Sequence, residues 1–337
     1  MKHFHLLLCG LLALILMPLP AGASRMSDRH PTAKKASYQS QSVTNPKRII
    51  NAIRSDNAYH ARTASFRQSS GESSGFESAT AGELRLASSK ALIVNQNTGE
   101  TIYAKSTNVP TPIASLTKLM TAMVMLDQHL PMEELISVSE GDVDTLKRTS
   151  SRLRVGATLL RHDMLQLALM SSENRAAFAL ARTSPQGVSA FVAAMNNKAA
   201  ELGMVHTHFV DPTGLNSENV STAEDLVKMV KAAYQYPEIR AASTSAQREV
   251  SVAGYRRPME FHNTNILVRN GGWDIGLSKT GYINEAGRCL VMQAQIADQP
   301  LIIVLLDSWG KYTRIGDAQR IRRWMESSVG SSRRPVG

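Results

Sequence analysis

Hydrophobic residues recur along the chain in two patterns, and each predicts a different kind of element. Residues 112–127, PIASLTKLMTAMVMLD, place large apolar side chains three and four positions apart, which indicates a helix beginning near Ser115. Residues 91–106, ALIVNQNTGETIYAKS, form two short β-rich runs around an Asn-Thr-Gly turn, which predicts a β-hairpin. The folded part therefore begins with two strands and enters its first long helix close to residue 115.

The rest of the folded part alternates in the same two periods. The predicted helices are residues 162–181, interrupted by the polar residues 171–174, then 188–203 and 317–327. The predicted strands are residues 275–282, 287–296 and 300–308, with turns at 284–287 and 298–300. Two early strands, three late strands and helices between them predict one α+β domain, which we place at residues 85–327.

The first residues follow another pattern, typical of a targeting segment. A basic Lys2, an apolar run over residues 6–16 and an Ala-Gly-Ala sequence ending at Ala23 indicate a secretory signal peptide, residues 1–23. The apolar run is too short to cross a bilayer, which takes about 20 residues. Residues 24–84 are rich in Ser, Gln, Arg and Asn and predict a flexible low-complexity linker, and residues 328–337 predict a disordered tail.

Net charge and cysteine content indicate which partners and which kind of thiol to expect in this protein. The formal net charge of +10 falls to +9 without Lys2, and export makes anionic wall polymer or lipid a better partner than nucleic acid. Nine basic and five acidic residues fall in 24–84, so this segment is either an inert spacer or a weak electrostatic tether. Cys289 is the only cysteine after the signal peptide, in a predicted strand, so we expect a buried thiol and no internal disulfide.

Ser115 and Lys118 form the first chemical motif, Ser-x-x-Lys. Two residue types at one spacing recur by chance about once in a chain of this length, and Ser308 to Lys311 is such a second copy that begins no helix. At a helix N-terminus, free N–H groups and the helix dipole favour negative charge on the Ser115 oxygen, and a lysine at i+3 reaches the same side. The alternative is a helix N-cap serine beside a solvated lysine.

A Ser-Lys pair needs a lysine that is neutral part of the time, so burial or a neighbouring cation must lower its pKa. Lys279, at the start of a predicted strand in the Lys-Thr-Gly triplet 279–281, could supply that cation. The interruption after Met170 holds Ser172 and Asn174, which could face Ser115 or form an ordinary solvent-facing turn.

Together, SLTK at 115–118, SEN at 172–174 and KTG at 279–281 resemble the three signatures of penicillin-binding proteins and serine β-lactamases. Residues 88–326 are most similar to the D-Ala-D-Ala carboxypeptidase family of low-molecular-mass penicillin-binding proteins, and within it to periplasmic D-alanyl-D-alanine endopeptidases. The segments DPTGL and FHNTN add to the likeness. The resemblance implies a β-lactamase/transpeptidase-like fold, a five-stranded antiparallel sheet flanked by helices with a helical subdomain.

The resemblance implies a serine peptidase that cleaves D-Ala–diaminopimelate cross-links of peptidoglycan and is inhibited by β-lactams. Ser115 would attack the D-Ala carbonyl, Lys118 would take its proton, and Ser172 would relay a proton to the leaving amine. The backbone N–H groups of Ser115 and Tyr282 would form the oxyanion hole.

The remaining motif residues would bind substrate. Asn174 would orient Lys118 and the acyl chain, Lys279 and Thr280 would gather the substrate carboxylate, and Gly281 would let the substrate backbone lie close to the strand. Arg314 lies where related carboxypeptidases place a carboxylate-binding arginine, with a solvated surface arginine as the alternative.

No metal or organic cofactor is implied. His206 and His208 have the spacing of a metal pair, but nothing nearby completes a ligand set. Association with the membrane surface or with other cell-wall enzymes is the remaining partner expectation, and we expect a periplasmic protein without a lasting membrane anchor.

Three other functions compete with the endopeptidase. A class A β-lactamase needs a deacylating glutamate, and the corresponding segment HFVDPTGLN has none. A plain carboxypeptidase usually continues into a β-rich domain and an amphipathic anchor, which do not follow residue 326 here. A non-catalytic peptidoglycan-binding scaffold would not need Ser115.

Overall fold

The structure is a computed structural model that describes residues 83–253 and 255–332. The predicted signal peptide, nearly all of the linker and the last five residues lie outside the described residues. Among the described helices, none combines the length and the hydropathy that crossing a bilayer requires.

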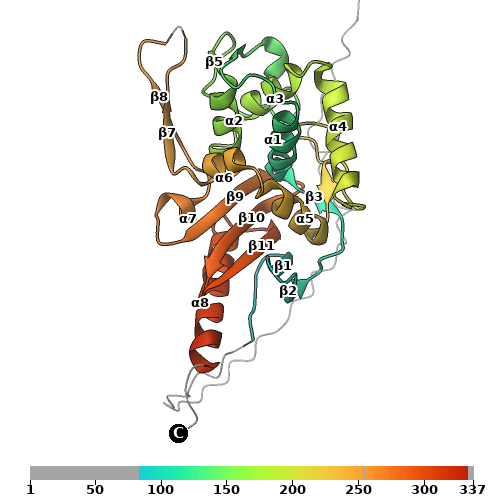
Figure 1. Cartoon of the computed structure of the whole chain (residues 1–337), viewed down its shortest axis with the longest axis vertical. Coiled ribbons are helices and arrows are strands. Elements are labelled where there is room, and N and C mark those ends of the chain that lie inside the picture. Colours follow the sequence, from blue (N-terminus) through green and yellow to red (C-terminus); the bar gives the residue numbers. More distant parts are fainter. Residues whose placement is uncertain (1–82, 254, 333–337) are drawn as a thin grey trace, which may run out of the picture. The chain divides into compact units, whose positions relative to one another are not determined.

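The centre of the domain is a five-stranded antiparallel sheet with strand order β2-β1-β11-β10-β9 (Figure 1). Its strands are β1 (Lys90–Asn95), β2 (Thr101–Lys105), β9 (Asp274–Ile283), β10 (Gly287–Ile296) and β11 (Gln299–Ser308). Three two-stranded sheets accompany it: β3 (Thr111–Pro112) with β6 (Val220–Ser221), β4 (Leu135–Ser137) with β5 (Thr158–Leu160), and β7 (Gln247–Val250) with β8 (Met259–His262). The predicted five-stranded sheet and both predicted late turns are confirmed.

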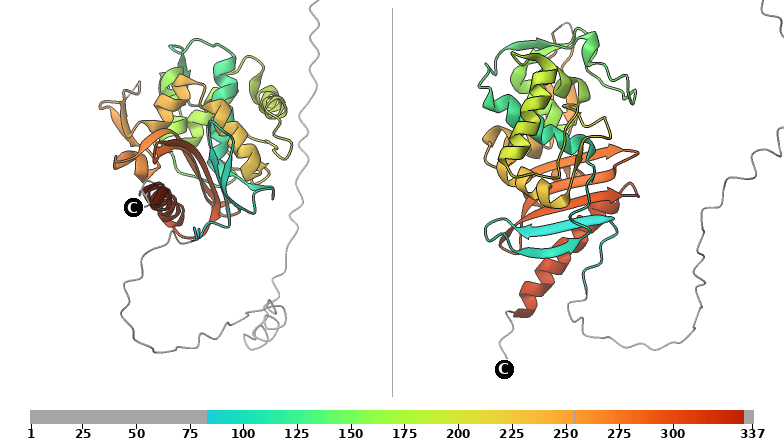
Figure 2. Two further views of the ribbon diagram at one scale, coloured as in Figure 1. Left: turned by 60° about the horizontal axis from the view of Figure 1, so that its bottom comes forward. Right: turned by 90° about the vertical axis from the view of Figure 1, so that its right-hand side faces the viewer.

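Helices cover both faces of this sheet. They are η1 (Ala114–Leu116), α1 (Thr117–Asp127), η2 (Glu140–Asp142), α2 (Arg161–Met170), α3 (Asn174–Arg182), α4 (Gly187–Glu201), α5 (Ala223–Ala233), α6 (Pro237–Thr244), α7 (Ile266–Arg269) and α8 (Thr313–Ser332). Figure 2 shows α8 lying along one face of the sheet, while the remaining long helices gather on the other side. The predicted α+β class with a helical subdomain is confirmed.

Alternate residues of the sheet enter two separate cores. In β11, Ile302 and Val304 pack toward α1 and α5, whereas Ile303 and Leu305 pack toward Ala318 and Ile321 of α8. Because both faces are buried, the central strands carry almost unbroken apolar runs, which is why their limits could be read from the sequence.

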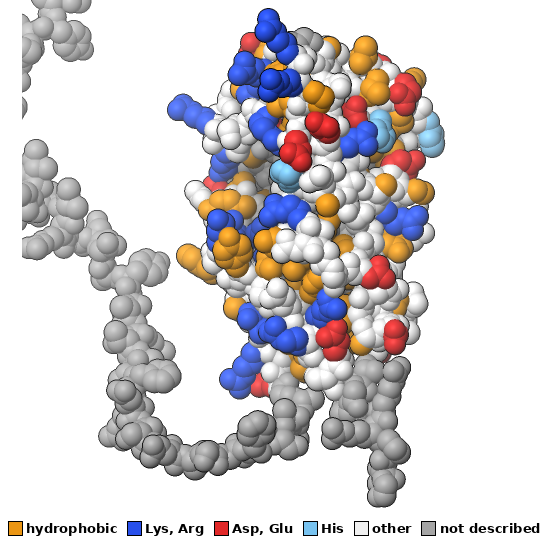
Figure 3. Space-filling model, turned by 90° about the vertical axis from the view of Figure 1, so that its left-hand side faces the viewer, with side chains coloured by type: hydrophobic (Ala, Val, Ile, Leu, Met, Phe, Trp, Pro, Cys, Tyr) orange, Lys and Arg blue, Asp and Glu red, His pale blue; other side chains and the backbone are white. Residues whose placement is uncertain are grey.

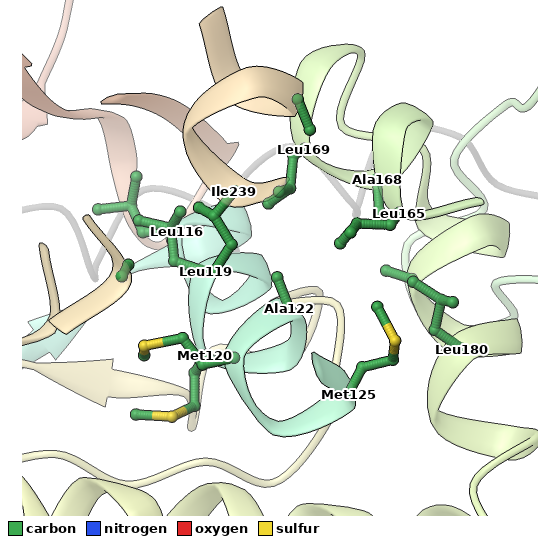
Figure 4. Close-up of a cluster of buried hydrophobic side chains, with 14 of the residues drawn as sticks. Leu116, Leu119, Met120, Ala122, Met125, Leu165, Ala168, Leu169, Leu180 and Ile239 are labelled. Atoms are coloured by element: carbon green, nitrogen blue, oxygen red, sulfur yellow. The ribbon is translucent and has the colours of Figure 1, made fainter. Parts of the chain in front are cut away.

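Helix α1 is the centre of the helical layer. Every residue from Thr117 to Met125 is buried, so the helix is enclosed on all sides. Figure 4 shows Leu119 and Ala122 of α1 facing Ile239 of α6 and the apolar side chains of α2 and α3. The start of α1, where Ser115 lies, is therefore held by packing from several elements.

Three boundaries differ from the sequence-based expectation. β9 begins at Asp274, so the Lys-Thr-Gly triplet lies in the second half of the strand and not at its start. Ser115 lies in the 3₁₀ turn η1, and α1 begins two residues later. Helix α8 continues to Ser332, five residues past the expected end at 327.

Cys289 is buried as expected, and burial raises the pKa of its thiol to about 11.

Candidate active site

Three segments that are far apart in the sequence meet beside α1. They are the turn η1, the connection between α2 and α3, and the second half of β9. β9 is an edge strand of the sheet, so half of its N–H and C=O groups point away from β10 and toward this meeting point. The structure thus brings together the three motifs expected to form the site.

The Ser115 turn is unusually constrained. Ala114, directly before it, has a φ of 49°, a left-handed conformation that costs a non-glycine residue about 1 kcal/mol. The Ala114 carbonyl is packed so tightly that a Cβ on Gly214 would lie 1.9 Å from its oxygen. On the other side, a Cβ on Gly281 would lie 3.1 Å from the Ser115 nitrogen. Gly281 was expected to make room for the substrate backbone. In the structure, the absence of a side chain at Gly281 makes room for the turn that carries Ser115.

Lys118 lies one turn after Ser115 and is 1% exposed. Its Nζ is 2.8 Å from the Ser115 Oγ, 2.7 Å from the Asn174 Oδ1 and 2.7 Å from the Thr213 carbonyl oxygen. The alternative of a capping serine beside a solvated lysine is wrong, because the lysine is buried and α1 has no side-chain cap.

The three partners of Lys118 can accept from an ammonium, and they can also accommodate a neutral amine. A neutral amine has two N–H groups and one lone pair, and two of its three partners, Asn174 Oδ1 and the Thr213 carbonyl, can only accept. The Asn174 amide is fixed in this orientation because its Nδ2 donates to the Thr149 Oγ1 at 3.0 Å. The lone pair of Lys118 is then left for the Ser115 hydroxyl.

Burial makes this neutral form accessible near neutral pH. Desolvation lowers the pKa of Lys118 to about 7. The carboxylates of Asp211 and Glu173 have the opposite effect on this pKa, because they favour the charged form. Of the two expected causes, burial and a neighbouring cation, burial is the main one. The pKa of Lys279 is itself held well below its usual range by burial and by the charges of Lys118 and Arg314.

Ser172 faces the second lysine. The Lys279 Nζ donates to the Ser172 Oγ at 2.8 Å and to the Thr280 carbonyl at 2.9 Å. Ser172 has a φ of 61°, so two left-handed residues, this one and Ala114, lie within the site. Strained backbone of this kind persists where the surroundings fix it, and it concentrates at functional sites.

The last motif residues line the end of β9. The Thr280 Oγ1 is 2.7 Å from the Thr264 Oγ1, and the side chain of Tyr282 is exposed. Arg314, at the start of α8, donates from Nη1 to the Gly281 carbonyl at 3.4 Å, and its pKa falls to about 10, mainly through burial. Arg314 therefore lies beside the triplet, and the alternative of a fully solvated arginine does not apply.

Sequence reasoning noted the DPTGL segment only for its likeness to the family and missed the role of the Thr213 carbonyl. The Asp211 carboxylate holds this loop by accepting from the N–H groups of Thr213, Gly214 and Asn216, at 2.6, 2.8 and 2.9 Å. A backbone contact leaves no signature of its own in the sequence, although Asp-Pro-Thr-Gly is a strong turn signal.

A hollow of about 250 Å³ borders the acceptors of Lys118. Its polar lining includes Asn174 and Thr213 together with Asp142, Asp144 and Asp211, and its apolar lining includes Leu146, Phe178 and Leu215. Within the described part of the chain, no group of three His, Cys, Asp or Glu side chains is placed to hold a metal ion. The chemistry of the site is that of a buried base beside a hydroxyl, with an open pocket next to it.

Comparison with known proteins assigns the family. The family model described as D-alanyl-D-alanine carboxypeptidase matches residues 77–310. The chain belongs to this family. A Pseudomonas aeruginosa protein named D-alanyl-D-alanine endopeptidase is 49% identical over 72% of this chain and 78% of its own. An Escherichia coli protein of the same name is 47% identical over 74% of this chain and 80% of its own.

Solved structures agree with this assignment. The crystal structure of the Streptomyces K15 DD-transpeptidase is 28% identical, with a TM-score of 0.67, over 72% of this chain and 98% of that one. The predicted family membership is confirmed, and the fold of this chain is the fold of a DD-peptidase. The members of this family act on peptidoglycan and bind β-lactams.

Proposed function

We propose that the protein is a serine peptidase that hydrolyses D-Ala–diaminopimelate cross-links of peptidoglycan through an acyl-enzyme on Ser115. The observation that carries the proposal is the buried Lys118 amine, 2.8 Å from the Ser115 hydroxyl and held by two other acceptors. The relatives named D-alanyl-D-alanine endopeptidase support the choice of bond.

Acylation begins with proton transfer. The Ser115 hydroxyl gives its proton to the neutral Lys118 amine while Oγ attacks the D-Ala carbonyl carbon. The N–H groups of Ser115 and Tyr282 donate to the oxyanion, which the closeness of Gly281 to the Ser115 nitrogen supports. When the C–N bond breaks, the leaving amine takes up the proton held by Lys118, with Ser172, the partner of Lys279, as the relay.

Deacylation uses the same groups in reverse order. Water adds to the acyl carbon and gives its proton to Lys118, the C–O bond to Ser115 breaks, and Ser115 regains its proton. Asp211, the carboxylate nearest to the β-lactamase position in sequence, is occupied by three N–H groups and by the Thr213 hydroxyl. Because these bonds occupy Asp211, it is not free to activate water, and we expect a β-lactam to remain on Ser115 as an inhibitor.

Two binding regions serve the two sides of the cut bond. Thr280, Lys279 and Arg314 gather the carboxylate of the leaving group, and the hollow beside Asn174 takes part of the acyl chain. The released amine of a diaminopimelate cross-link belongs to a D-configured centre with its own carboxylate, as terminal D-Ala does. The same site therefore has a second candidate activity, trimming of terminal D-Ala, which the family description favours.

We also propose that the protein is exported to the periplasm. Residues 1–23 carry the signal-peptide pattern, and the substrate is an extracytoplasmic polymer. The mature chain is expected to begin at Ser24 and to be recovered from the periplasm without detergent. The basic segment before the domain gives a weak tether to the anionic wall or membrane surface, or to other cell-wall enzymes.

The test compares two substrates by mass spectrometry. Mature protein is incubated with a cross-linked muropeptide dimer and, separately, with a monomeric pentapeptide, with Ser115→Ala as the control. Conversion of the dimer to monomers, lost in the variant, is the expected result. Trimming of the pentapeptide alone would establish the carboxypeptidase instead, and no turnover of either substrate would refute the enzyme and leave the scaffold.

A further inference from the structure

Three exposed aromatic side chains lie at one end of the central sheet, beside the catalytic groups. Tyr282 is 51% exposed, Trp309 is 89% exposed and Tyr312 is 61% exposed. Aromatic side chains of this size are usually at least partly covered in a folded domain, so three of them together mark an interaction surface. We call Tyr282, Trp309 and Tyr312 the aromatic platform.

The register of the sheet places these residues together. Tyr282 at the end of β9 is paired with Arg288 of β10, and Arg288 is paired with Ser308 at the end of β11. Trp309 directly follows Ser308. Because neighbouring strands are about 4.8 Å apart, Tyr282 and Trp309 lie within roughly three strand widths of one another. Tyr282 directly follows Gly281, and Arg314, two residues after Tyr312, donates to the Gly281 carbonyl, so both parts of the platform begin beside the Gly281 end of the candidate active site.

The second part of the platform is held by the local backbone. β11 contains a bulge before Ser308, where Asp307 has a φ of 51°. Trp309 and Tyr312 then belong to a tight turn, in which the Thr313 N–H donates to the Gly310 carbonyl at 3.2 Å and begins α8. The same turn overlaps the second Ser-x-x-Lys segment of the chain, Ser308 to Lys311. This segment has no role in the proposed catalytic mechanism.

Cations stand next to the rings. The Arg288 guanidinium is 4.4 Å from the centre of the Tyr282 ring, and the Lys311 amine is 5.4 Å from that of Tyr312. The nearby carboxylates are already paired, Glu285 with Lys147 and Asp307 with Lys90. Figure 3 shows one face of the molecule, on which basic side chains outnumber acidic ones, in keeping with the net positive charge of the chain. The platform thus favours a partner with flat apolar faces and negative charge.

We propose that the aromatic platform binds the leaving half of the cross-link, the anionic stem peptide with its attached sugar. This inference rests on the proposed function and names the specificity site of the same reaction. Bond cleavage needs only the groups near Ser115, but a cross-linked substrate carries a second peptide past the leaving amine. Its carboxylates match Arg288 and Lys311, and its sugar ring offers flat C–H faces to Trp309 and Tyr312.

The test uses the full mature protein and measures kcat/KM for two dimers and the second-order acylation rate constant for a penicillin. The substrates are a muropeptide dimer with its sugars, a dimer whose leaving half is trimmed to diaminopimelate, and fluorescent penicillin as an acylation probe. The variants are Trp309→Ala, Tyr312→Ala and the pair together. Val205→Ala is the matched control, because Val205 lies in the turn after α4 and its side chain is 77% exposed.

We expect the double variant to lose about tenfold or more in kcat/KM on the full dimer, the size of effect seen for a central aromatic contact. The trimmed dimer and the penicillin probe should react as with the wild type, as should Val205→Ala with all three. Equal losses on both dimers would overturn the proposal, as would no loss at all.

A separate arm tests the membrane as the occupant of the platform. Loss of binding to anionic phospholipid vesicles in the double variant, with dimer cleavage intact, would overturn the proposal in favour of a lipid surface. Failure of the wild type to cleave either dimer would instead refute the proposed function, so the two failures are distinguishable.

Discussion

Replacing Gly214 by alanine tests how the nucleophile is held. Gly214 has a φ of 81°, and an alanine Cβ there would lie 1.9 Å from the Ala114 oxygen and 2.4 Å from the Ala114 carbonyl carbon. Real Cβ atoms essentially never approach within 3.0 Å of another heavy atom, so the difference requires a movement of 1.1 Å. Both atoms are backbone, and no side-chain rotation can relieve the overlap.

Whichever segment moves, the site is damaged. A shift of Ala114 carries Ser115 with it, and a shift of the Asp211–Gly214 loop carries the Thr213 carbonyl away from Lys118. A misplacement of about 1 Å can slow an enzyme by about 100-fold. We therefore expect Gly214→Ala to slow acylation by about that factor, measured as the second-order rate constant with fluorescent penicillin.

Gly203 provides the matched control. It has a φ of 69° at the end of α4, but a Cβ there would meet nothing within 4 Å. Both alanine variants should lose roughly 1–2 kcal/mol of unfolding free energy from the left-handed conformation, and only Gly214→Ala should lose a further ~1–3 kcal/mol from overlap. Wild-type acylation by Gly214→Ala, or an equal loss in Gly203→Ala, would refute the reasoning.

Three further predictions concern the groups around Ser115. The acylation rate should rise with pH and reach half its maximum near 7, because Lys118 accepts the proton only when neutral and burial lowers its pKa to about 7; a rate that is flat from pH 6 to 8 would contradict this. Ser172→Gly should be more stable to thermal unfolding than Ser172→Ala by about 1 kcal/mol, because the φ of 61° suits glycine, while both variants lose the partner of Lys279. Thr149→Val should slow acylation about fivefold, because the hydrogen bond that orients Asn174 is worth about 1 kcal/mol; unchanged acylation at an unchanged melting temperature would remove Thr149 from the site.

The elements around the site could be predicted because their sequence periods are clear. The helix after Ser115, the break after Met170 and the three late strands all match the structure, since buried helices and strands leave regular apolar patterns. β9 begins at Asp274, one residue before the predicted strand 275–282. What the sequence did not locate was the Lys-Thr-Gly triplet within it, which was expected at a strand start and lies in the second half of β9.

The details of the site depend on contacts that a linear pattern does not record. The carbonyl of Thr213 and the orientation of Asn174 by Thr149 involve backbone atoms or residues of ordinary type. The pKa of Lys118 follows from how completely the fold buries it, and the sequence indicated only that some cause must exist. The role of Gly281 likewise depends on which backbone approaches it, and here it is the turn of Ser115.

The central claim is that Ser115 is the residue that becomes acylated. The most direct measurement is mass spectrometry of the mature protein after reaction with benzylpenicillin, followed by proteolysis and mapping of the adduct. The account predicts one adduct per chain on the peptide that contains Ser115, absent from Ser115→Ala and strongly reduced in Lys118→Met. An adduct on another residue, or one retained by Ser115→Ala, would contradict it.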